Sequence, residues 1–477
     1  MTTRVSLAGK KIERFRCDKM IFGKVKKLFF VGIGGAGMSG IAEILYNLGY
    51  EIRGSDYSPS EITRYLQSLG IDVSHEHRPE NIKKTDVVVI SSAVGDDNPE
   101  VVEAHKRGIP VIKRAEMLGE LMRLKFSIGI AGTHGKTTTT SMIGKILQQG
   151  NYQPTLIVGG VVAELGTGAA LGRGDYLVAE ADEYDRSFLS MYPTVAVVTN
   201  LEADHLDCYA DMEDLVNSYL SYMNRVPFYG SVIISADDKN LLRLRPRIVR
   251  PQATFGFSRD ADYHAVNITF EQGRSTFSAY HKDELLGEVM LHVPGRHNVA
   301  NALAAVATCR ELEVPFTTIA DGLLTFSGIS RRFEIIGEIN GVTVIDDYAH
   351  HPTEIMATLQ TAREVYGRTV IVVYQPHLYS RTRDFVNQFA EALALADRCL
   401  LVDIYPAREK PIAGVTSEII MRKAHKKKIG DFSYIGPKEN APTEVARVAR
   451  PGDVVIIMGA GSITLIKNQV LEALGKI

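Results

Sequence analysis

The chain has 477 residues, a formal net charge of -2 and 45% hydrophobic residues. A single hydrophobic core stops growing at about 250 to 300 residues, so a chain of this length divides into two or three domains. The near-zero net charge excludes a global basic field that would attract nucleic acid or an anionic membrane surface. We therefore expect a globular protein whose partners include no nucleic acid and no membrane.

The cysteines and the N-terminal segment bear on where the protein works. The four cysteines lie far apart and form no Cys-x-x-Cys pair, at Cys17, Cys208, Cys309 and Cys399. This spacing argues against a disulfide framework or a structural zinc site. Residues 1–27 are rich in lysine and arginine but lack the apolar run of a secretory signal, and no segment reaches transmembrane length. These features predict a cytoplasmic protein with a solvated basic leader, or a small interaction arm, at its start.

Apolar runs that end in glycine or polar residues alternate with helix-length segments in the first quarter of the chain. The first run, residues 28–32 (LFFVG), is typical of a buried parallel strand, and a helix is expected at 38–48. Further strands are expected at 51–55 and 86–91, and further helices at 62–69 and 99–107. Repeated strand–helix–strand winding predicts a parallel sheet.

Two further starts of the same kind follow. Residues 126–131 (FSIGIA) form an apolar run before a glycine turn and a helical pattern at 136–149. More strands are expected at 176–180, 194–199 and 231–235, antiparallel hairpins within 261–288, and a last set of strands at 342–346, 369–374, 399–403 and 453–458. The sequence thus predicts an α/β protein of three α/β domains: Rossmann-like over 1–114, P-loop ATPase-like over 115–331, and Rossmann-like over 332–477.

The segment Gly132-Thr133-His134-Gly135-Lys136-Thr137 lies between an expected strand and an expected helix. Backbone N–H groups and a helix N-terminus converge on a phosphate in such a turn. Lys136 would neutralise the β- and γ-phosphates, and Thr137 would offer its hydroxyl to Mg²⁺. The strict P-loop spacing asks for glycine at 130, where the chain has Ile130, so the motif indicates a subset of nucleotide enzymes. A purely structural glycine turn would explain neither Lys136 nor the strand–helix context.

Carboxylates follow the next two expected strands. Glu180 emerges at the C-terminal end of one strand, where open α/β sheets bind ligands, and Asp204 and His205 follow the other. A lone histidine is usually structural, but its coincidence with Glu180 and Lys136 favours a metal site. The surplus acids of this region can be explained as solvated groups: Asp182, Glu183 and Asp185.

Near the N-terminus, the residues from Gly32 to Gly37 (GIGGAG) resemble a dinucleotide fingerprint, and Asp56 ends the second strand about 20 residues further on. Such a turn places a pyrophosphate on a helix N-terminus and an acid near a ribose. It therefore fits a UDP-sugar as well as NAD. A structural glycine turn is the alternative.

Two polar segments directly follow expected strands in the last third, at 346–352 (DDYAHHP) and 375–383 (QPHLYSRTR). Arg381 and Arg383 could hold carboxylates by bidentate hydrogen bonds, while the acids and His350 could bind an amine or relay protons. For any one residue, a capping acid or a solvated arginine is the alternative.

Together these motifs resemble the Mur ligase family, in the family's order from residue 28 to residue 461. The matching segments are VGIGGAGMSGIAE, RAEML, AGTHGKTTTT, EADEYDRSF, NLEADHLD, PGRHNVANALAA, SGISRRFE, DDYAHHPTE and QPHLYSRTRD. The resemblance implies that the N-terminal domain holds the UDP part of the substrate, that the central domain holds ATP and metal, and that the C-terminal domain closes over them with an amino acid.

The resemblance also implies the site residues. Those expected to bind ATP are Gly132, Thr133, His134, Gly135, Lys136, Thr137, Thr138, Asn298, Asn301 and Arg332. Those expected to bind the UDP substrate are Gly34, Gly35, Ala36, Gly37, Asp56, Ser91 and Ser92. Thr137, Glu180 and His205 would bind Mg²⁺, with Mn²⁺ as an alternative. Catalytic roles fall to Lys136, Glu180, His205, Arg332, Asp347 (or Asp346) and His350, and the amino-acid side is completed by Tyr348, Arg381 and Arg383.

The implied reaction is the ATP-dependent ligation of L-alanine to the lactyl carboxylate of UDP-N-acetylmuramate, a step of peptidoglycan precursor synthesis. The γ-phosphoryl group moves to the carboxylate, and the alanine amine then displaces phosphate from the acyl phosphate. Other family members carry a carbamoylated lysine after the NxxxDH segment, but residues 211–230 contain no lysine, which favours the alanine-adding branch over the D-glutamate-adding branch. A monomer or a weak homodimer is expected.

Three alternatives stay open at this point. A recycling ligase that attaches a tripeptide to UDP-N-acetylmuramate shares the ATP chemistry, although the GIGGAGMSG segment argues against it. A dinucleotide-dependent oxidoreductase is suggested by the first glycine motif and Asp56, but it leaves GTHGKT unexplained. A non-catalytic nucleotide-binding regulator is opposed by Glu180, His205 and the Arg381 region.

Overall fold

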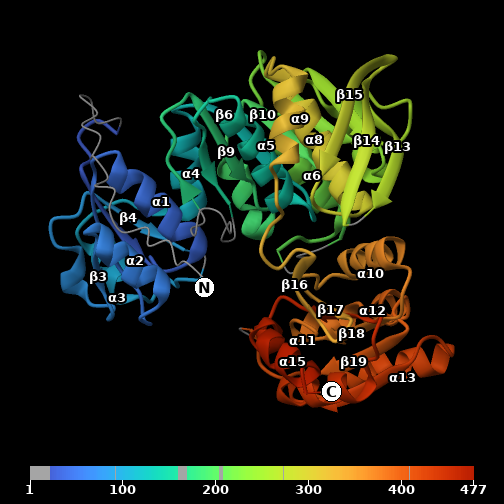
Figure 1. The fold of residues 1–477 in the computed structure, drawn as a ribbon. Helices are drawn as coiled ribbons and strands as arrows, with labels where there is room; N and C mark the ends of the chain where they lie inside the picture. The colour runs from blue at the N-terminus through green and yellow to red at the C-terminus, as the bar shows by residue number, and fades with distance from the viewer. Residues whose placement is uncertain are drawn as a thin grey trace, which may run out of the picture. The chain divides into compact units, whose positions relative to one another are not determined.

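The structure is a computed structural model, and it describes residues 22–91, 93–158, 169–203, 208–271, 273–407 and 409–476. Within these ranges the chain forms three sheets, of five, ten and six strands, with helices between their strands (Figure 1). The predicted α/β class, with three α/β regions, is confirmed. The domain boundaries expected at residues 114 and 331 stay predictions.

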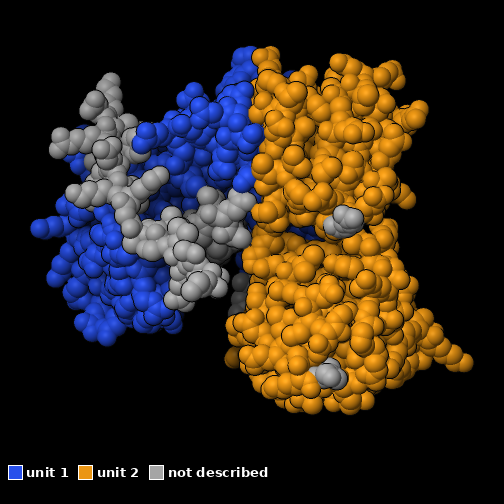
Figure 2. Space-filling view, in the orientation of Figure 1, with its two compact units in different colours: residues 1–233, 240–252 blue, residues 234–239, 253–477 orange. Residues whose placement is uncertain are grey.

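Two compact units make up the chain, and Figure 2 draws them in different colours. Unit 1 contains residues 1–233 and 240–252, and unit 2 contains residues 234–239 and 253–477. The five-stranded sheet belongs to unit 1 and the six-stranded sheet to unit 2. In the described part of the chain, no helix combines the length and the apolar character needed to cross a membrane.

The five-stranded sheet is parallel and has the order β3-β2-β1-β4-β5. Its strands are β1 (Lys27–Val31), β2 (Glu51–Ser55), β3 (Asp72–Ser74), β4 (Val87–Ile90) and β5 (Val111–Lys113), and its helices are α1 (Ala36–Asn47), α2 (Glu61–Leu69), α3 (Pro99–Lys106) and α4 (Arg114–Met122). The strand order reverses between β1 and β4. Open α/β sheets bind ligands beyond the carboxyl ends of the strands at such a point, where the glycine motif begins here.

The ten-stranded sheet has the order β15-β14-β13-β12-β11-β10-β6-β9-β7-β8. In unit 1 it includes β6 (Phe126–Ala131), β7 (Thr155–Ile157), β8 (Ala169–Ala170), β9 (Tyr176–Glu180) and β10 (Val195–Val198), with helices α5 (Lys136–Gln149) and α6 (Met212–Met223) and the 3-10 segment η2 (Tyr184–Ser190). Strand β6 pairs in parallel with both β9 and β10. The loops that follow these three strands therefore emerge at one edge of the sheet.

The rest of this sheet is mixed. Strand β11 (Ser231–Ser235) is followed by helix α7 (Lys239–Leu244), and the remaining elements are β12 (Gln252–Gly256), β13 (Tyr263–Glu271), β14 (Arg274–His281), β15 (Glu284–Leu291), α8 (Arg296–Glu311) and α9 (Phe316–Leu324). Strands β13, β14 and β15 pair in antiparallel fashion, which confirms the hairpins expected within residues 261–288.

The six-stranded sheet has the order β16-β17-β21-β18-β19-β20, in which only β16 is antiparallel to its neighbour. Its elements are β16 (Glu334–Ile339), β17 (Val342–Asp347), α10 (Pro352–Tyr366), β18 (Val370–Tyr374), α11 (Tyr379–Asp384), α12 (Val386–Leu393), β19 (Arg398–Val402), α13 (Glu418–Lys427), β20 (Phe432–Gly436), α14 (Ala441–Val448), β21 (Val454–Met458) and α15 (Lys467–Leu474). Successive strand residues face opposite sides: Val372 joins a core with α10, α12 and α13, and Val373 joins a core with α14 and α15.

Phe30 lies in the centre of β1 and is fully buried, whereas Phe228, in the same unit, is 85% exposed. Truncation of a buried phenylalanine removes packing and leaves a cavity, so Phe30→Ala should lower the free energy of unfolding by about 3 to 5 kcal/mol. The matched control Phe228→Ala should stay within about 0.5 kcal/mol of the unchanged protein. Urea unfolding measures both. Equal losses in the two variants would contradict the placement of Phe30 in the core.

Candidate active site

The glycine turn after β6 is bonded to the loop after β10. Gly132 has a φ of +134°, and a Cβ atom at this position would lie 2.1 Å from the Thr199 hydroxyl, so only glycine fits. His134 N donates a hydrogen bond to Asn200 Oδ1 at 2.8 Å, and the Thr199 hydroxyl donates to His134 O at 2.6 Å. Two segments that the sequence predicted to meet at the sheet edge are thus held together.

Lys136, the first residue of α5, directs its ammonium group into this turn. Its Nζ lies 2.7 Å from Gly132 O, and 2.8 and 3.1 Å from the two carboxylate oxygens of Glu183. Burial acts to lower the pKa of Lys136, but three nearby carboxylates together outweigh burial and raise this pKa above its ordinary value. In order of their effect, these carboxylates belong to Glu183, Asp182 and Glu180. Lys136 therefore keeps its positive charge at neutral pH.

Glu183 is only 2% exposed, so the expectation that it is a solvated acid was wrong. A carboxylate is rarely buried unless it is paired, and Lys136 supplies the partner here. Asp185 agrees with the expectation, since its side chain is 42% exposed and lies 3.1 Å from Lys113 Nζ. The sequence offered one signal for Glu183, its position three residues beyond the end of an apolar strand, but this position does not distinguish a buried acid from an exposed one.

The residues predicted to bind Mg²⁺ are only partly described. Glu180 ends β9 in register with Ile130 of β6, and its charge reaches Lys136. Thr137 follows in the first turn of α5, and His205 lies outside the described residues. Three carboxylates against one ammonium leave an excess of negative charge beside a phosphate-binding turn. Oxygen ligands with excess negative charge fit a hard cation such as Mg²⁺.

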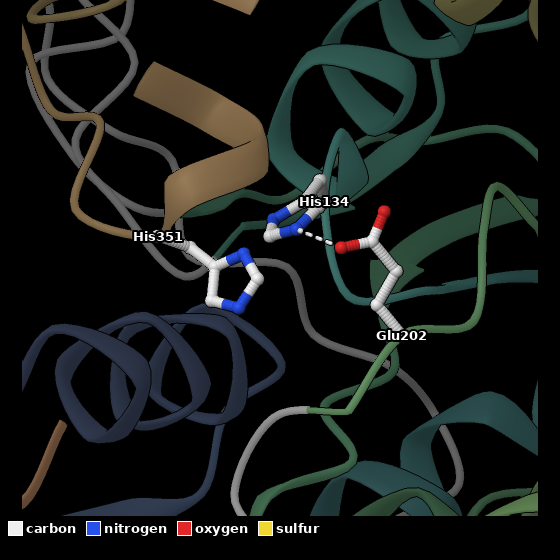
Figure 3. A group of neighbouring side chains, drawn as sticks. All are labelled: His134, Glu202 and His351. Atoms are coloured by element: carbon white, nitrogen blue, oxygen red, sulfur yellow. Dashed lines mark ion pairs between the residues drawn. The ribbon is translucent and has the colours of Figure 1, made fainter. Parts of the chain in front are cut away.

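His134 has an acidic partner that the sequence reasoning missed. Its Nε2 lies 3.5 Å from Glu202 Oε2, and Figure 3 draws this ion pair, which is charged when His134 is protonated. Glu202 N also donates to the Thr133 hydroxyl at 2.9 Å. Glu202 belongs to the NLEADHLD segment, so its position in the motif was the only available signal. These contacts add Thr133 and the side chain of His134 to the bonds between the glycine turn and the loop after β10.

Asp56 is hydrogen-bonded to the first glycine motif, and its contact with a ribose stays a prediction. Gly34 N donates to Asp56 Oδ2 at 2.9 Å, and a Cβ atom at Gly34 would lie 2.8 Å from that oxygen. Ser91, at the end of β4, lies against Gly32. The structure therefore gathers these predicted UDP-binding residues at one edge of the five-stranded sheet. Ser92 and the side chain of Ala36 lie outside the described residues.

Arg114 was quoted within the RAEML motif but given no role. Its guanidinium covers Gly37, where a Cβ atom would lie 2.8 Å from Arg114 Nη1. A pocket of about 90 Å³ lies beside it in unit 1. The residues that line the pocket come from the start of α4 and from the acidic loop after β9: Lys113, Arg114, Ala115, Asp182, Tyr184, Asp185 and Ser187. This pocket lies next to the predicted UDP-binding turn, and its lining combines two basic side chains with two aspartates.

A buried carboxylate also supports the end of β2. Glu100 is fully buried, and its oxygens accept hydrogen bonds from the Ser55 hydroxyl at 2.7 Å and Asn81 Nδ2 at 2.6 Å, with His77 Nδ1 at 2.7 Å. Ser55 precedes Asp56, so this network fixes the strand end that presents Asp56. Glu100 lies on the apolar side of a short helix, and nothing in the sequence marked it as buried.

The two adjacent aspartates at the end of β17 have different surroundings. Asp347 accepts hydrogen bonds from Phe333 N at 2.7 Å and Ala349 N at 2.8 Å. Asp346 points to the other face, where it accepts a hydrogen bond from the Thr464 hydroxyl at 2.6 Å. Alternation along the strand thus separates them, and Asp347 is the one that lies near Arg332. Burial raises the pKa of Asp347 to about 6, against the effects of Arg332 and the backbone donors.

Glu354 joins several of the predicted C-terminal residues, although the sequence reasoning gave it no role. Its carboxylate lies 3.3 Å from Arg332 Nη1 and 3.1 Å from His350 Nδ1, and it accepts a hydrogen bond from His350 N at 3.0 Å. The guanidinium of Arg332 lies 5.1 Å from the centre of the Tyr348 ring, and the rings of Tyr348 and His350 meet edge to face. Arg332, Tyr348 and His350 are therefore brought together.

The two arginines of α11 are separated by the fold. Arg381 is 7% exposed, with its Nη1 3.4 Å from His377 Nδ1, and the His377 ring lies near that of His350. Arg383 has a side chain that is 53% exposed, and it pairs with the adjacent Asp384 at 2.6 Å. The exposure of Arg383 agrees with the solvated alternative considered for these arginines, and its contact with an amino-acid substrate stays a prediction.

Helix α8 carries the two asparagines predicted to face the adenine nucleotide. Asn298 and Asn301 are 7% and 8% exposed, and Asn298 Nδ2 donates to Pro294 O at 2.7 Å. Directly before Asn298 in the motif, His297 has its Nδ1 3.5 Å from the Thr361 hydroxyl of α10. Burial, with a further contribution from Arg332, lowers the pKa of His297 to about 4, so this imidazole is neutral at physiological pH. The contact of asparagines with a nucleotide stays a prediction.

The raised pKa of Asp347 predicts a pH-dependent stability. Its folded-state pKa of about 6 exceeds the ordinary 3.8, so its stabilising contribution is complete below pH 3.8 and is lost as the pH rises through 6. Asp347→Asn has no proton to lose, so its stability relative to the unchanged protein should rise by about 1 kcal/mol between pH 5 and pH 7. Urea unfolding at several pH values measures this difference. A difference that does not change with pH would show that Asp347 titrates normally.

Comparison with known proteins places this geometry in a family. Three family models match the chain in order: "Mur ligase family, catalytic domain" over residues 27–126, "Mur ligase middle domain" over 130–309, and "Mur ligase, glutamate ligase domain" over 331–461. The UDP-N-acetylmuramate--L-alanine ligase of Geobacter sulfurreducens is 49% identical over 445 residues, which cover 93% of this chain and 96% of that protein. The enzyme of the same name from Geobacter sp. strain M21 is 48% identical over 94% of this chain and 98% of its own length.

Solved structures agree with this placement. The crystal structure of the UDP-N-acetylmuramate-alanine ligase of Thermotoga maritima matches with a TM-score of 0.78 and 29% identity, covering 94% of this chain and 99% of that chain. A murein peptide ligase from Psychrobacter arcticus matches with a TM-score of 0.67 and 26% identity, covering 95% and 99%. Both comparisons extend over all three sheets described above. The chain therefore belongs to the Mur ligase family.

Proposed function

We propose that this protein joins L-alanine to the lactyl carboxylate of UDP-N-acetylmuramate, with conversion of ATP to ADP and phosphate. The observation that carries the proposal is the match to L-alanine ligases at 48% to 49% identity across more than nine-tenths of the chain. The active-site geometry supports it, because the phosphate-binding turn and the Lys136 ammonium beside it, with Glu180 as a predicted magnesium ligand, are parts that phosphoryl transfer from ATP requires.

In the first step, the backbone N–H groups of the glycine turn and the Lys136 ammonium bind the phosphates of ATP. Two anions must then approach each other, the γ-phosphoryl group and the substrate carboxylate. The charge of Lys136 offsets their repulsion, and its raised pKa keeps that charge in place. Thr137, Glu180 and His205 would hold Mg²⁺, which supplies further neutralisation of phosphate charge when bound. The carboxylate oxygen attacks phosphorus, and ADP leaves.

In the second step, the amine of L-alanine loses a proton and attacks the acyl carbon, and phosphate leaves with the electron pair of the broken C–O bond. Among the residues predicted to bind the amino acid, Asp347 and His350 are the groups that could accept the proton from the alanine amine. Asp347 has a pKa of about 6 and is mostly ionised at neutral pH, so it can stabilise the ammonium form or accept its proton. Glu354 orients His350 through the contacts described above.

Phosphate release from ATP, Mg²⁺ and UDP-N-acetylmuramate tests the proposal directly. L-alanine should stimulate release more than glycine, L-serine or a tripeptide, and mass spectrometry should find UDP-N-acetylmuramoyl-L-alanine. One methyl group in an apolar pocket is worth about 1 to 3 kcal/mol. The kcat/KM for glycine should therefore be lower than that for L-alanine by a factor of roughly 10 or more. Stimulation by the tripeptide alone would establish a recycling ligase instead. Nucleotide binding without any turnover of ATP would indicate a non-catalytic nucleotide-binding protein.

Substitution of Lys136 tests its catalytic role. Lys136→Ala should lower kcat for this reaction about 100-fold or more, because an electrostatic group aimed at developing charge is worth that much in enzymes. Lys145 lies nine residues further along α5 and provides the control, since Lys145→Ala should keep kcat near that of the unchanged protein. A Lys136→Ala variant with unchanged kcat would rule out a role for this ammonium group in phosphoryl transfer.

A further inference from the structure

Glu183 is a buried carboxylate that the proposed reaction does not use. Lys136, the residue expected to bind phosphate oxygens, already holds the two oxygens of Glu183 at 2.8 and 3.1 Å and Gly132 O at 2.7 Å. An ammonium group has three donors, and with Thr133 O at 3.5 Å the acceptors around it already outnumber them. A phosphate oxygen can therefore bind Lys136 only if it replaces one of the present acceptors.

The position of Glu183 is fixed by its backbone as well as by Lys136. The Tyr209 hydroxyl donates to Glu183 O at 2.6 Å, and Arg186 N donates to the same oxygen at 3.0 Å. The turn that follows has φ values of +53° at Asp185 and +54° at Arg186, a conformation that residues other than glycine adopt at a cost. The Arg186 guanidinium pairs with Asp214 at the start of α6, which holds the turn in place.

We propose that Glu183 is a positioning residue that occupies, before ATP binds, the place at the Lys136 ammonium that phosphate oxygens take afterwards. This inference rests on the ATP-binding part of the proposed function. A largely desolvated ammonium group is unfavourable without a close anionic partner, so the carboxylate holds the Lys136 ammonium at the glycine turn before nucleotide binds. The same carboxylate then competes with the nucleotide for Lys136 and repels the phosphates. Glu183 thus maintains the phosphate site at the expense of nucleotide affinity.

Glu183→Gln keeps the size and an acceptor oxygen but removes the charge. We expect this variant to bind ADP about 10-fold more tightly than the unchanged protein, measured by calorimetry with EDTA to exclude metal ions. Asp182→Asn is the matched control. This variant removes an equal negative charge, and the charge of Asp182 also raises the pKa of Lys136. The Asp182 carboxylate, however, accepts a hydrogen bond from Tyr184 N instead of contacting Lys136. The control should change ADP affinity much less.

Several results would overturn the inference. These are unchanged or weaker ADP binding by Glu183→Gln, equal tightening in both variants, or a loss of thermal stability without a change in affinity. An effect seen only when Mg²⁺ is added would assign Glu183 to the metal site instead. If Glu183→Gln does not fold, Glu183→Asp tests the same point, since the shorter side chain draws the charge away from Lys136 and should also tighten ADP binding. Failure of the unchanged protein to bind ADP would contradict the proposed function itself.

Discussion

The partly buried ammonium group of Lys136, at the edge of the ten-stranded sheet, makes the contacts on which the rest of the site depends. A buried positive charge is tolerated only when acceptors surround it closely. The glycine turn supplies a backbone carbonyl, and the acidic loop after β9 supplies Glu183, with Asp182 and Glu180 near enough to act through their charge. Parallel strands make this possible, because β6, β9 and β10 end at the same edge.

In the other two sheets, too, a carboxylate at the end of a strand contacts the neighbouring loop, but there its partners are backbone N–H groups. At the end of β2, Asp56 accepts the backbone N–H of Gly34 and so fixes the glycine turn after β1. At the end of β17, Asp347 accepts two backbone N–H groups and fixes the start of the DDYAHHPTE loop. Each sheet thus has a carboxylate that stabilises the polar loop next to it. Such hydrogen bonds to a charged group are worth about 1.5 to 3 kcal/mol each, more than neutral ones.

The sequence predicted the architecture well because long apolar runs between polar loops carry a strong signal. Strands β2, β6, β9 and β11 begin and end at the predicted residues. Short strands such as β3, β7 and β20 were not predicted, since three to five residues at or near the edge of a sheet contain too few apolar positions to be recognised. The hairpins within 261–288 were predicted from alternation of polar and apolar residues.

The site was predicted where the backbone imposes the residue type. Glycines at 34 and 132 are required by contacts closer than 3 Å, and such constraints appear in the sequence as motifs. Charged residues that depend on tertiary partners were not predicted in the same way. Burial of Glu183 follows from Lys136, burial of Glu100 from Ser55 and its neighbours, and the role of Glu354 from Arg332. These partners lie far away in the sequence, so the local sequence pattern does not predict them.

In the proposed reaction, phosphoryl transfer to the substrate carboxylate precedes amide formation. Transfer of ¹⁸O from the lactyl carboxylate of labelled UDP-N-acetylmuramate tests this claim most directly. If the carboxylate oxygen attacks the γ-phosphorus held at Lys136, each turnover leaves one ¹⁸O atom in the released phosphate, which mass spectrometry detects. Ligation of L-alanine with unlabelled phosphate would contradict the acyl phosphate and the role assigned to this site.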